Sequence, residues 1–165
     1  MRRPLPPDNT AQALLASTST PRWRLIYVLI YLALGLFALL ALLTWTPHPG
    51  MQALVLQALT GYAALLVSFT GGLHWGVGLR YLATTSRVPA FHFVWGPLPA
   101  LLAWGAMLLP AHLGLLLMAA VYALAHLVDV RVWPGSGLAP WVPLRQQFTV
   151  GAMACCVLGA VATPW

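Results

Sequence analysis

Long apolar stretches without a charged residue constrain this chain more than any other feature of its sequence. Leu25 to Trp45 contains no charge, and a helix needs about 20 apolar residues to cross a hydrocarbon core about 30 Å thick. Hydrophobic residues make up 61% of the 165 residues and charged residues only 6%, whereas soluble domains carry about 25% charged residues. The sequence therefore predicts an all-α integral membrane protein without an attached soluble domain.

Five stretches are long and apolar enough to be predicted as spans. They cover about residues 25–45, 51–79, 91–109, 111–128 and 144–163, and a flexible cytoplasmic tail is expected over residues 1–24. The third span contains Pro97 and Pro99, which predict a kink near its start. The fourth follows Pro110 with almost no linker, so the third and fourth should form an antiparallel hairpin. We expect one five-helix domain over residues 25–165.

The arginines predict how these helices are oriented. They lie before the first span, after the second and around the loop between the fourth and fifth: Arg2, Arg3, Arg22, Arg24, Arg80, Arg87, Arg131 and Arg145. With five spans these three regions share one side, which the positive-inside rule assigns to the cytoplasm. The N-terminus is then cytoplasmic and the C-terminus periplasmic.

The net charge of +6 bears on the choice of partner. The arginines flank apolar spans and form neither a basic helix nor an aromatic platform for bases, so nucleic acid is not expected as a partner. Contact with the anionic headgroups of the lipid bilayer explains their placement.

The glycine-rich stretch SFTGGLHWGVGLRY, residues 68–81, stands at the end of the second predicted span. Its small residues recur at spacings that suit the close approach of two helix backbones. We predict a helix-packing surface there, either inside the chain or against another membrane subunit, and it consists of Ser68, Gly71, Gly72 and Gly76.

Polar side chains gather near the predicted cytoplasmic ends of the spans. His74 and His126 lie at similar depth on two helices, so they could ligate a haem b or hydrogen-bond a quinone headgroup, with Trp75 beside them. The alternative is that protein groups satisfy each histidine. Asp129 is the only acidic residue outside the tail and needs a cation, for which Arg145 or Arg80 is better placed than Arg131.

Catalytic groups are scarce in this sequence. The chain has no Glu and no Lys, so acid-base chemistry would depend on His, Asp129 or Tyr. Ser68 and His74 face different directions on a helix, and the adjacent Cys155 and Cys156 lack the spacing of a redox or metal site. We therefore predict no catalytic site, no metal site and no firmly implied cofactor, and we do not expect an enzyme.

Four segments, VSFTGGLHWGVGL, PLPALLAWGAMLLP, LAHLVDVR and GLAPWVPLRQQFTV, together resemble a small multispan membrane family of unknown function. That family includes mitochondrial transmembrane protein 69 and proteobacterial relatives. The resemblance runs from about Tyr27 to the C-terminus and implies five helices in a bacterial or mitochondrial inner membrane. It also adds Trp141 and Thr149 to the residues of interest. Members that carry arginine in place of His74 favour a polar contact over a haem ligand there.

The expected function is that of a non-catalytic accessory or assembly subunit. We expect it in a respiratory or photosynthetic electron-transfer complex of the bacterial inner membrane, with a mitochondrial inner membrane less favoured, packing through the glycine-rich second helix. The alternative is a quinone-, haem- or lipid-binding protein that uses His74 and His126 near the cytoplasmic face. A transporter or channel fits poorly, because the spans show no internal repeat.

Overall fold

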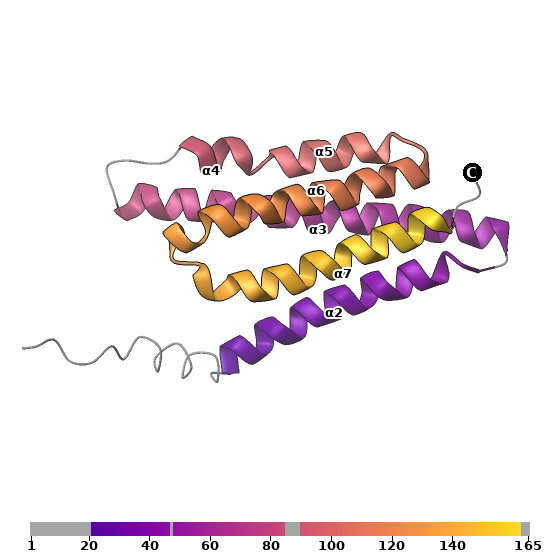
Figure 1. Cartoon of the computed structure of the whole chain (residues 1–165), viewed down its shortest axis with the longest axis horizontal. Helices are drawn as coiled ribbons and strands as arrows, with labels where there is room; N and C mark the ends of the chain where they lie inside the picture. Colours follow the sequence, from indigo (N-terminus) through magenta and orange to yellow (C-terminus); the bar gives the residue numbers. More distant parts are fainter. Residues whose placement is uncertain (1–20, 47, 85–89, 163–165) are drawn as a thin grey trace, which may run out of the picture.

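A computed structural model describes residues 21–46, 48–84 and 90–162 (Figure 1). Helices make up the fold, with no strand among these residues, so the all-α prediction is confirmed. In chain order they are α2 (Pro21–Leu43), α3 (Pro49–Thr84), α4 (Ala90–Trp95), α5 (Leu98–Met107), α6 (Ala111–Val132), the short 3-10 helices η1 (Pro134–Ser136) and η2 (Ala139–Trp141), and α7 (Val142–Val161). Arg2, Arg3, Arg87 and most of the predicted tail lie outside the described residues.

Four of the described helices are long and apolar enough to cross a membrane, namely α2, α3, α6 and the segment Ala139–Val161 that contains α7. Their outward side chains are large and apolar, as at Leu32, Leu54 and Leu65, which are 64%, 66% and 70% exposed. Soluble monomers rarely expose apolar patches on this scale, whereas lipid covers them readily. The chain is a multi-pass membrane protein.

The third predicted span, residues 91–109, is broken into α4 and α5, which lie end to end along α3 and α6 (Figure 1). Pro97 and Pro99 have no N–H to donate to the carbonyls of Phe93 and Trp95, so two helical hydrogen bonds are lost at this point. The predicted kink is therefore a full interruption at Gly96 and Pro97.

Two helices extend beyond their predicted bounds. α2 begins at Pro21, so residues 21–24 are helical and do not belong to a tail. Proline suits the first turn of a helix because its φ is already helical and its missing N–H is not needed there. α3 continues past Leu79 to Thr84, which places Arg80 inside the helix.

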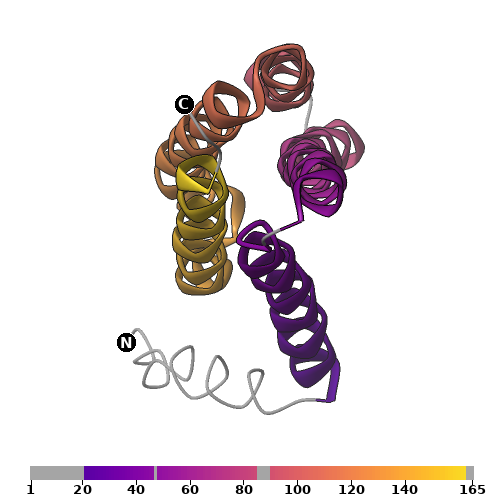
Figure 2. The ribbon, with the colours of Figure 1, turned by 90° about the vertical axis from the view of Figure 1, so that its right-hand side faces the viewer.

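The helices form a ring in the order α2, α3, α4 with α5, α6 and α7, and it closes where α7 packs on α2 (Figure 2). Successive helices run antiparallel, so the start of α2, the ends of α3 and α6, and the start of α7 share one end of the bundle (Figure 1). Arg24, Arg80, Arg131 and Arg145 belong to these helix ends. The structure thus gathers the described arginines as the sequence predicted, and which compartment they face stays a prediction.

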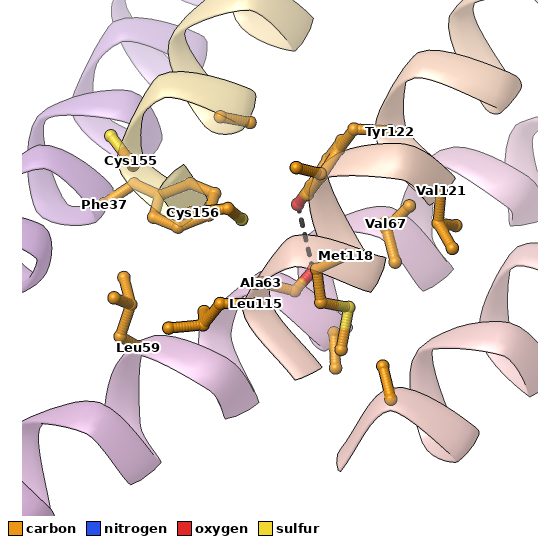
Figure 3. Packing of buried hydrophobic residues seen from close by; sticks show 14 of the residues in the cluster. Phe37, Leu59, Ala63, Val67, Leu115, Met118, Val121, Tyr122, Cys155 and Cys156 are labelled. Atoms are coloured by element: carbon orange, nitrogen blue, oxygen red, sulfur yellow. Dashed lines mark hydrogen bonds between the residues drawn. The ribbon is translucent and has the colours of Figure 1, made fainter. Parts of the chain in front are cut away.

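Buried apolar side chains from α2, α3, α6 and α7 fill the centre (Figure 3). Phe37, Leu59 and Met118 are fully buried there, and the Tyr122 hydroxyl donates to the Ala63 carbonyl at 2.9 Å. Cys155 and Cys156 are buried and carry no disulfide. The buried ion pair of Asp129 and Arg145 lies outside this core, toward the end of the bundle that carries the arginines.

Candidate functional site

The break between α4 and α5 packs against one face of α3. Gly71, His74, Trp75 and Gly78 form this face, since His74 and Trp75 come three and four residues after Gly71, and Gly78 comes four and three residues after them. A Cβ added at Gly71 would lie under 3.0 Å from the Gly96 carbonyl oxygen, and one at Gly78 would lie 2.9 Å from the Phe93 ring. Glycine at these two positions lets the broken helix approach α3 closely.

Trp75 supplies a hydrogen bond that the break removes from α4. Its indole N–H donates to the Phe93 carbonyl oxygen at 3.1 Å, which is the carbonyl that Pro97 leaves without its helical partner. A backbone carbonyl within a membrane costs several kcal/mol when it stays unpaired. Trp75 therefore has a structural role in holding α4 and α5 against α3.

His74 stands in the middle of a row of polar side chains that we call the polar chain: His92 on α4, His74 on α3, Asp129 on α6 and Arg145 on α7. His74 Nδ1 lies 3.2 Å from His92 Nδ1, and His74 Nε2 lies 2.9 Å from Asp129 Oδ1. Asp129 Oδ2 accepts a hydrogen bond from Arg145 Nε at 2.7 Å. The polar chain thereby links four helices.

All members of the polar chain are buried, with exposures of 0% for His74, 3% for His92, 2% for Asp129 and 6% for Arg145. A buried carboxylate needs paired charge and hydrogen bonds, and Asp129 obtains both from Arg145 and His74. When both histidines are neutral, His74 donates from Nε2 to Asp129 and accepts at Nδ1 from His92. The polar chain then carries no net charge.

This geometry speaks against haem ligation by His74. An axial histidine needs a free ring nitrogen for the iron, and both nitrogens of His74 already face Asp129 and His92. His126, the other predicted ligand, lies one turn before Asp129 on α6 and does not join the polar chain. The two histidines do not form the paired site that the sequence suggested.

Three other predicted residues take structural positions outside the polar chain. Arg80 donates from Nη2 to the Ser136 carbonyl at 2.6 Å, which ties the end of α3 to η1. Trp141 packs on Trp23 of α2 with ring centroids 4.6 Å apart. The Ser68 hydroxyl donates to the Ala64 carbonyl of its own helix at 2.7 Å.

Only part of the predicted glycine packing surface contacts other helices of this protein. Gly71 is buried, whereas Gly72 and Gly76 are exposed, and a Cβ added to either would meet nothing within 4 Å. Adjacent residues on a helix point about 100° apart, so Gly71 faces α5 while Gly72 faces outward. The intramolecular prediction is wrong for Gly72 and Gly76, and contact with another subunit stays a prediction.

A groove of about 390 Å³ opens beside these outward glycines, between α3 and α5. The lining residues are Gly61, Ala64, Leu65, Ser68, Ala100, Ala103, Trp104 and Met107.

Several buried polar atoms have no hydrogen-bond partner among the described residues. They are Nη1 and Nη2 of Arg145, Oγ1 of Thr149, Nδ1 of His126 and Nε1 of Trp133. Thr149 lies one turn after Arg145 on the same side of α7. The residues that the structure describes therefore include buried polar atoms beyond those that the polar chain uses.

His92 is the member of the polar chain that the sequence analysis missed. It is the only side chain in α4, AFHFVW, that can form a charge. A polar residue within an apolar membrane segment is a signal of function or structure in its own right. The segment that joins α3 to α4 gives no spacing from which its contact with His74 could have been predicted.

Comparison with curated proteins and with solved structures found no match. A family profile described as "Protein of unknown function (DUF3429)" matches residues 16–161, which include the whole polar chain, the break between α4 and α5, and the outward glycines of α3. The match covers most of the chain, and this protein therefore belongs to the DUF3429 family.

Proposed function

We propose that this protein is a non-catalytic accessory or assembly subunit of an inner-membrane complex. Its docking surface would be the outer glycine face, by which we mean Ser68, Gly72 and Gly76, together with the adjoining groove between α3 and α5. The open space over Gly72 and Gly76 carries the proposal.

Helix association in lipid gains little from the hydrophobic effect and depends on close packing of backbones. The outer glycine face runs from Ser68 to Gly76, so a backbone can approach along about 12 Å of α3 at 1.5 Å per residue. Leu65 and Phe69, which are 70% and 69% exposed, form ridges next to it. A partner helix with complementary side chains would pack between them.

The buried residues support a non-catalytic role. His74, Asp129 and Arg145 bond to one another across three helices, in an arrangement suited to holding a bundle together. We place the protein in the bacterial inner membrane, with the arginine end of the bundle in the cytoplasm and the C-terminus in the periplasm. We also propose that its family is the one that includes mitochondrial transmembrane protein 69, and that respiratory or photosynthetic electron-transfer complexes are the first partners to test.

Affinity purification in mild detergent tests this proposal. The tagged protein is compared with Gly72→Leu and with Gly35→Leu on α2, where an added Cβ also meets nothing within 4 Å. We expect wild type and Gly35→Leu to retain a stoichiometric membrane partner in mass spectrometry, and Gly72→Leu to lose it while accumulating normally. Equal retention by both variants, or a wild-type protein without any partner, would refute the proposal.

A further inference from the structure

We propose that His74 and His92 form a proton-binding relay, in which His92 binds a proton from the arginine end of the bundle and the positive charge passes to His74. The contact between the Nδ1 atoms of the two rings, 3.2 Å apart, carries this proposal, together with the bond from the other ring nitrogen of His74 to Asp129. The relay goes beyond the docking proposal and does not depend on it, because the outer glycine face takes no part in it.

Hydrogen bonding fixes the neutral tautomer of both rings. His74 must carry its hydrogen on Nε2 to donate to the Asp129 carboxylate at 2.9 Å, so its Nδ1 is an acceptor. His92 therefore carries its hydrogen on Nδ1, and its Nε2 keeps a lone pair. Two nitrogens 3.2 Å apart accommodate one hydrogen between them, whereas none would leave two lone pairs facing each other and two would make the N–H groups collide.

The Nε2 atom of His92 is the place where a proton can bind. It makes no hydrogen bond with a described residue, yet it does not belong to the fully buried atoms that lack a partner, so part of its surface is exposed. His92 is the third residue of α4, which begins at Ala90 near the arginine end of the bundle (Figure 1). A proton needs no cavity, only a lone pair that water can reach.

The hydrogen between the rings lets the charge move while both rings stay in place. A proton forms an N–H bond at His92 Nε2, and the shared hydrogen then leaves His92 Nδ1 and bonds to His74 Nδ1. His92 is neutral again, with its hydrogen on Nε2, and His74 has become an imidazolium. The same atoms remain hydrogen-bonded throughout the polar chain, and only the bond between the two histidines changes direction.

The charged groups around the two rings favour the charge on His74. The Asp129 carboxylate lies 2.9 Å from His74 Nε2, and charge-assisted hydrogen bonds are about twice as strong as neutral ones. His92 has only the Tyr81 ring of α3 stacked on it, at 5.9 Å. Arg145 opposes a charge on His74 but bonds to the other carboxylate oxygen, Oδ2. The described parts of α4 and α5 hold no other titratable side chain, and the remaining such groups at this end of α3 and α6 are Arg80, His126 and Arg131.

Nitrogen-15 NMR of the detergent-purified full chain, labelled at histidine, tests the relay, because ring nitrogens with and without a hydrogen give separate signals. At about pH 8 we expect the hydrogen of His92 on Nδ1, and at about pH 5 on Nε2, while His74 gains a hydrogen on Nδ1. The two rings together thus take up one proton. The exposed His48 is the internal reference, since it should become protonated on both of its own nitrogens.

Two variants test the role of His74. His74→Gln keeps one donor and one acceptor but cannot take up the charge, so His92 should keep its hydrogen on Nδ1 and become charged itself. His126→Gln, outside the polar chain, should leave the wild-type change at His92 intact. The reverse pattern, with the change kept in His74→Gln or lost in His126→Gln, would overturn the proposal.

The wild-type spectra alone can also overturn the relay, so the test does not depend on how well a variant folds. It would be wrong if His92 carried its hydrogen on Nε2 at the higher pH. It would also be wrong if neither ring gained a proton at the lower pH, or if His92 became protonated on both nitrogens as His48 does.

Discussion

Replacing Gly71 and Gly72 separately with alanine tests how α3 accommodates the break between α4 and α5. The two glycines are adjacent in one helix, so the change in helix propensity is nearly the same for both and cancels in the comparison. What differs is the space around the added methyl group. At Gly71 it would lie under 3.0 Å from the Gly96 carbonyl oxygen, whereas at Gly72 it would meet nothing within 4 Å.

The expected difference in the free energy of unfolding depends on which atom the added methyl group would meet. A flexible side chain could turn away, but a backbone oxygen moves only with its helix, and Pro99 contributes further atoms at 3.3 and 3.4 Å. Overpacking a buried site typically costs about 1–3 kcal/mol. We expect Gly71→Ala to have a free energy of unfolding lower than that of Gly72→Ala by about 2–3 kcal/mol, near the upper end of that range.

Reversible unfolding in mixed micelles of increasing SDS content, followed by circular dichroism, measures this difference. Gly72→Ala should unfold at the SDS fraction of the wild type or above it, and Gly71→Ala clearly below. The explanation would be refuted if the two variants unfolded together, or if Gly71→Ala were the more stable one.

Three further changes are predicted for the same unfolding assay. Asp129→Asn leaves the buried Arg145 charge unbalanced and should lower the free energy of unfolding by about 3–5 kcal/mol; a loss under 1 kcal/mol would contradict the ion pair. Trp75→Phe leaves the Phe93 carbonyl without its donor and should cost about 1–3 kcal/mol, whereas Trp104→Phe, on the exposed groove side, should change little. Tyr122→Phe removes a buried hydrogen bond and should cost about 1 kcal/mol; an unchanged midpoint would argue that this bond contributes nothing.

Much of the fold could be predicted because membrane spans depend on length and apolar composition. The stretches that became α2, α3, α6 and α7 are uninterrupted and nearly free of charge, so their existence follows from the bilayer thickness. Pro97 and Pro99 marked a weak point in the third span. Whether they cause a kink or a break depends on partners such as Trp75, which only the packed structure brings to the freed carbonyl.

The candidate site could be predicted where few partners were available. Asp129 is the sole acidic residue outside the first 24 residues, so a cation was expected to meet it. The sequence left Arg145 and Arg80 as candidates, and the structure shows that Arg145 is the partner. The partners of the histidines were less determined, because two buried rings can pair in many ways. His92 and not His126 meets His74, and this depends on where α4 packs against α3.

The facing directions of the α3 glycines could not be predicted either. A helix with small residues on two neighbouring lines can present either line to its own chain. The position of the α4 and α5 break decides that Gly71 and Gly78 face inward, and this leaves Gly72 and Gly76 for lipid or another subunit.

A double-mutant cycle on Asp129 and Arg145 tests most directly the central claim that their buried ion pair holds α6 and α7 together. Asp129→Asn, Arg145→Gln and the double variant are compared in the SDS unfolding assay. Removal of one charge leaves the other buried without a partner, whereas removal of both does not. The double variant should therefore lose less free energy of unfolding than the two single variants lose together, by at least about 2 kcal/mol. Additive losses would contradict the claim and would mean that the two side chains act independently.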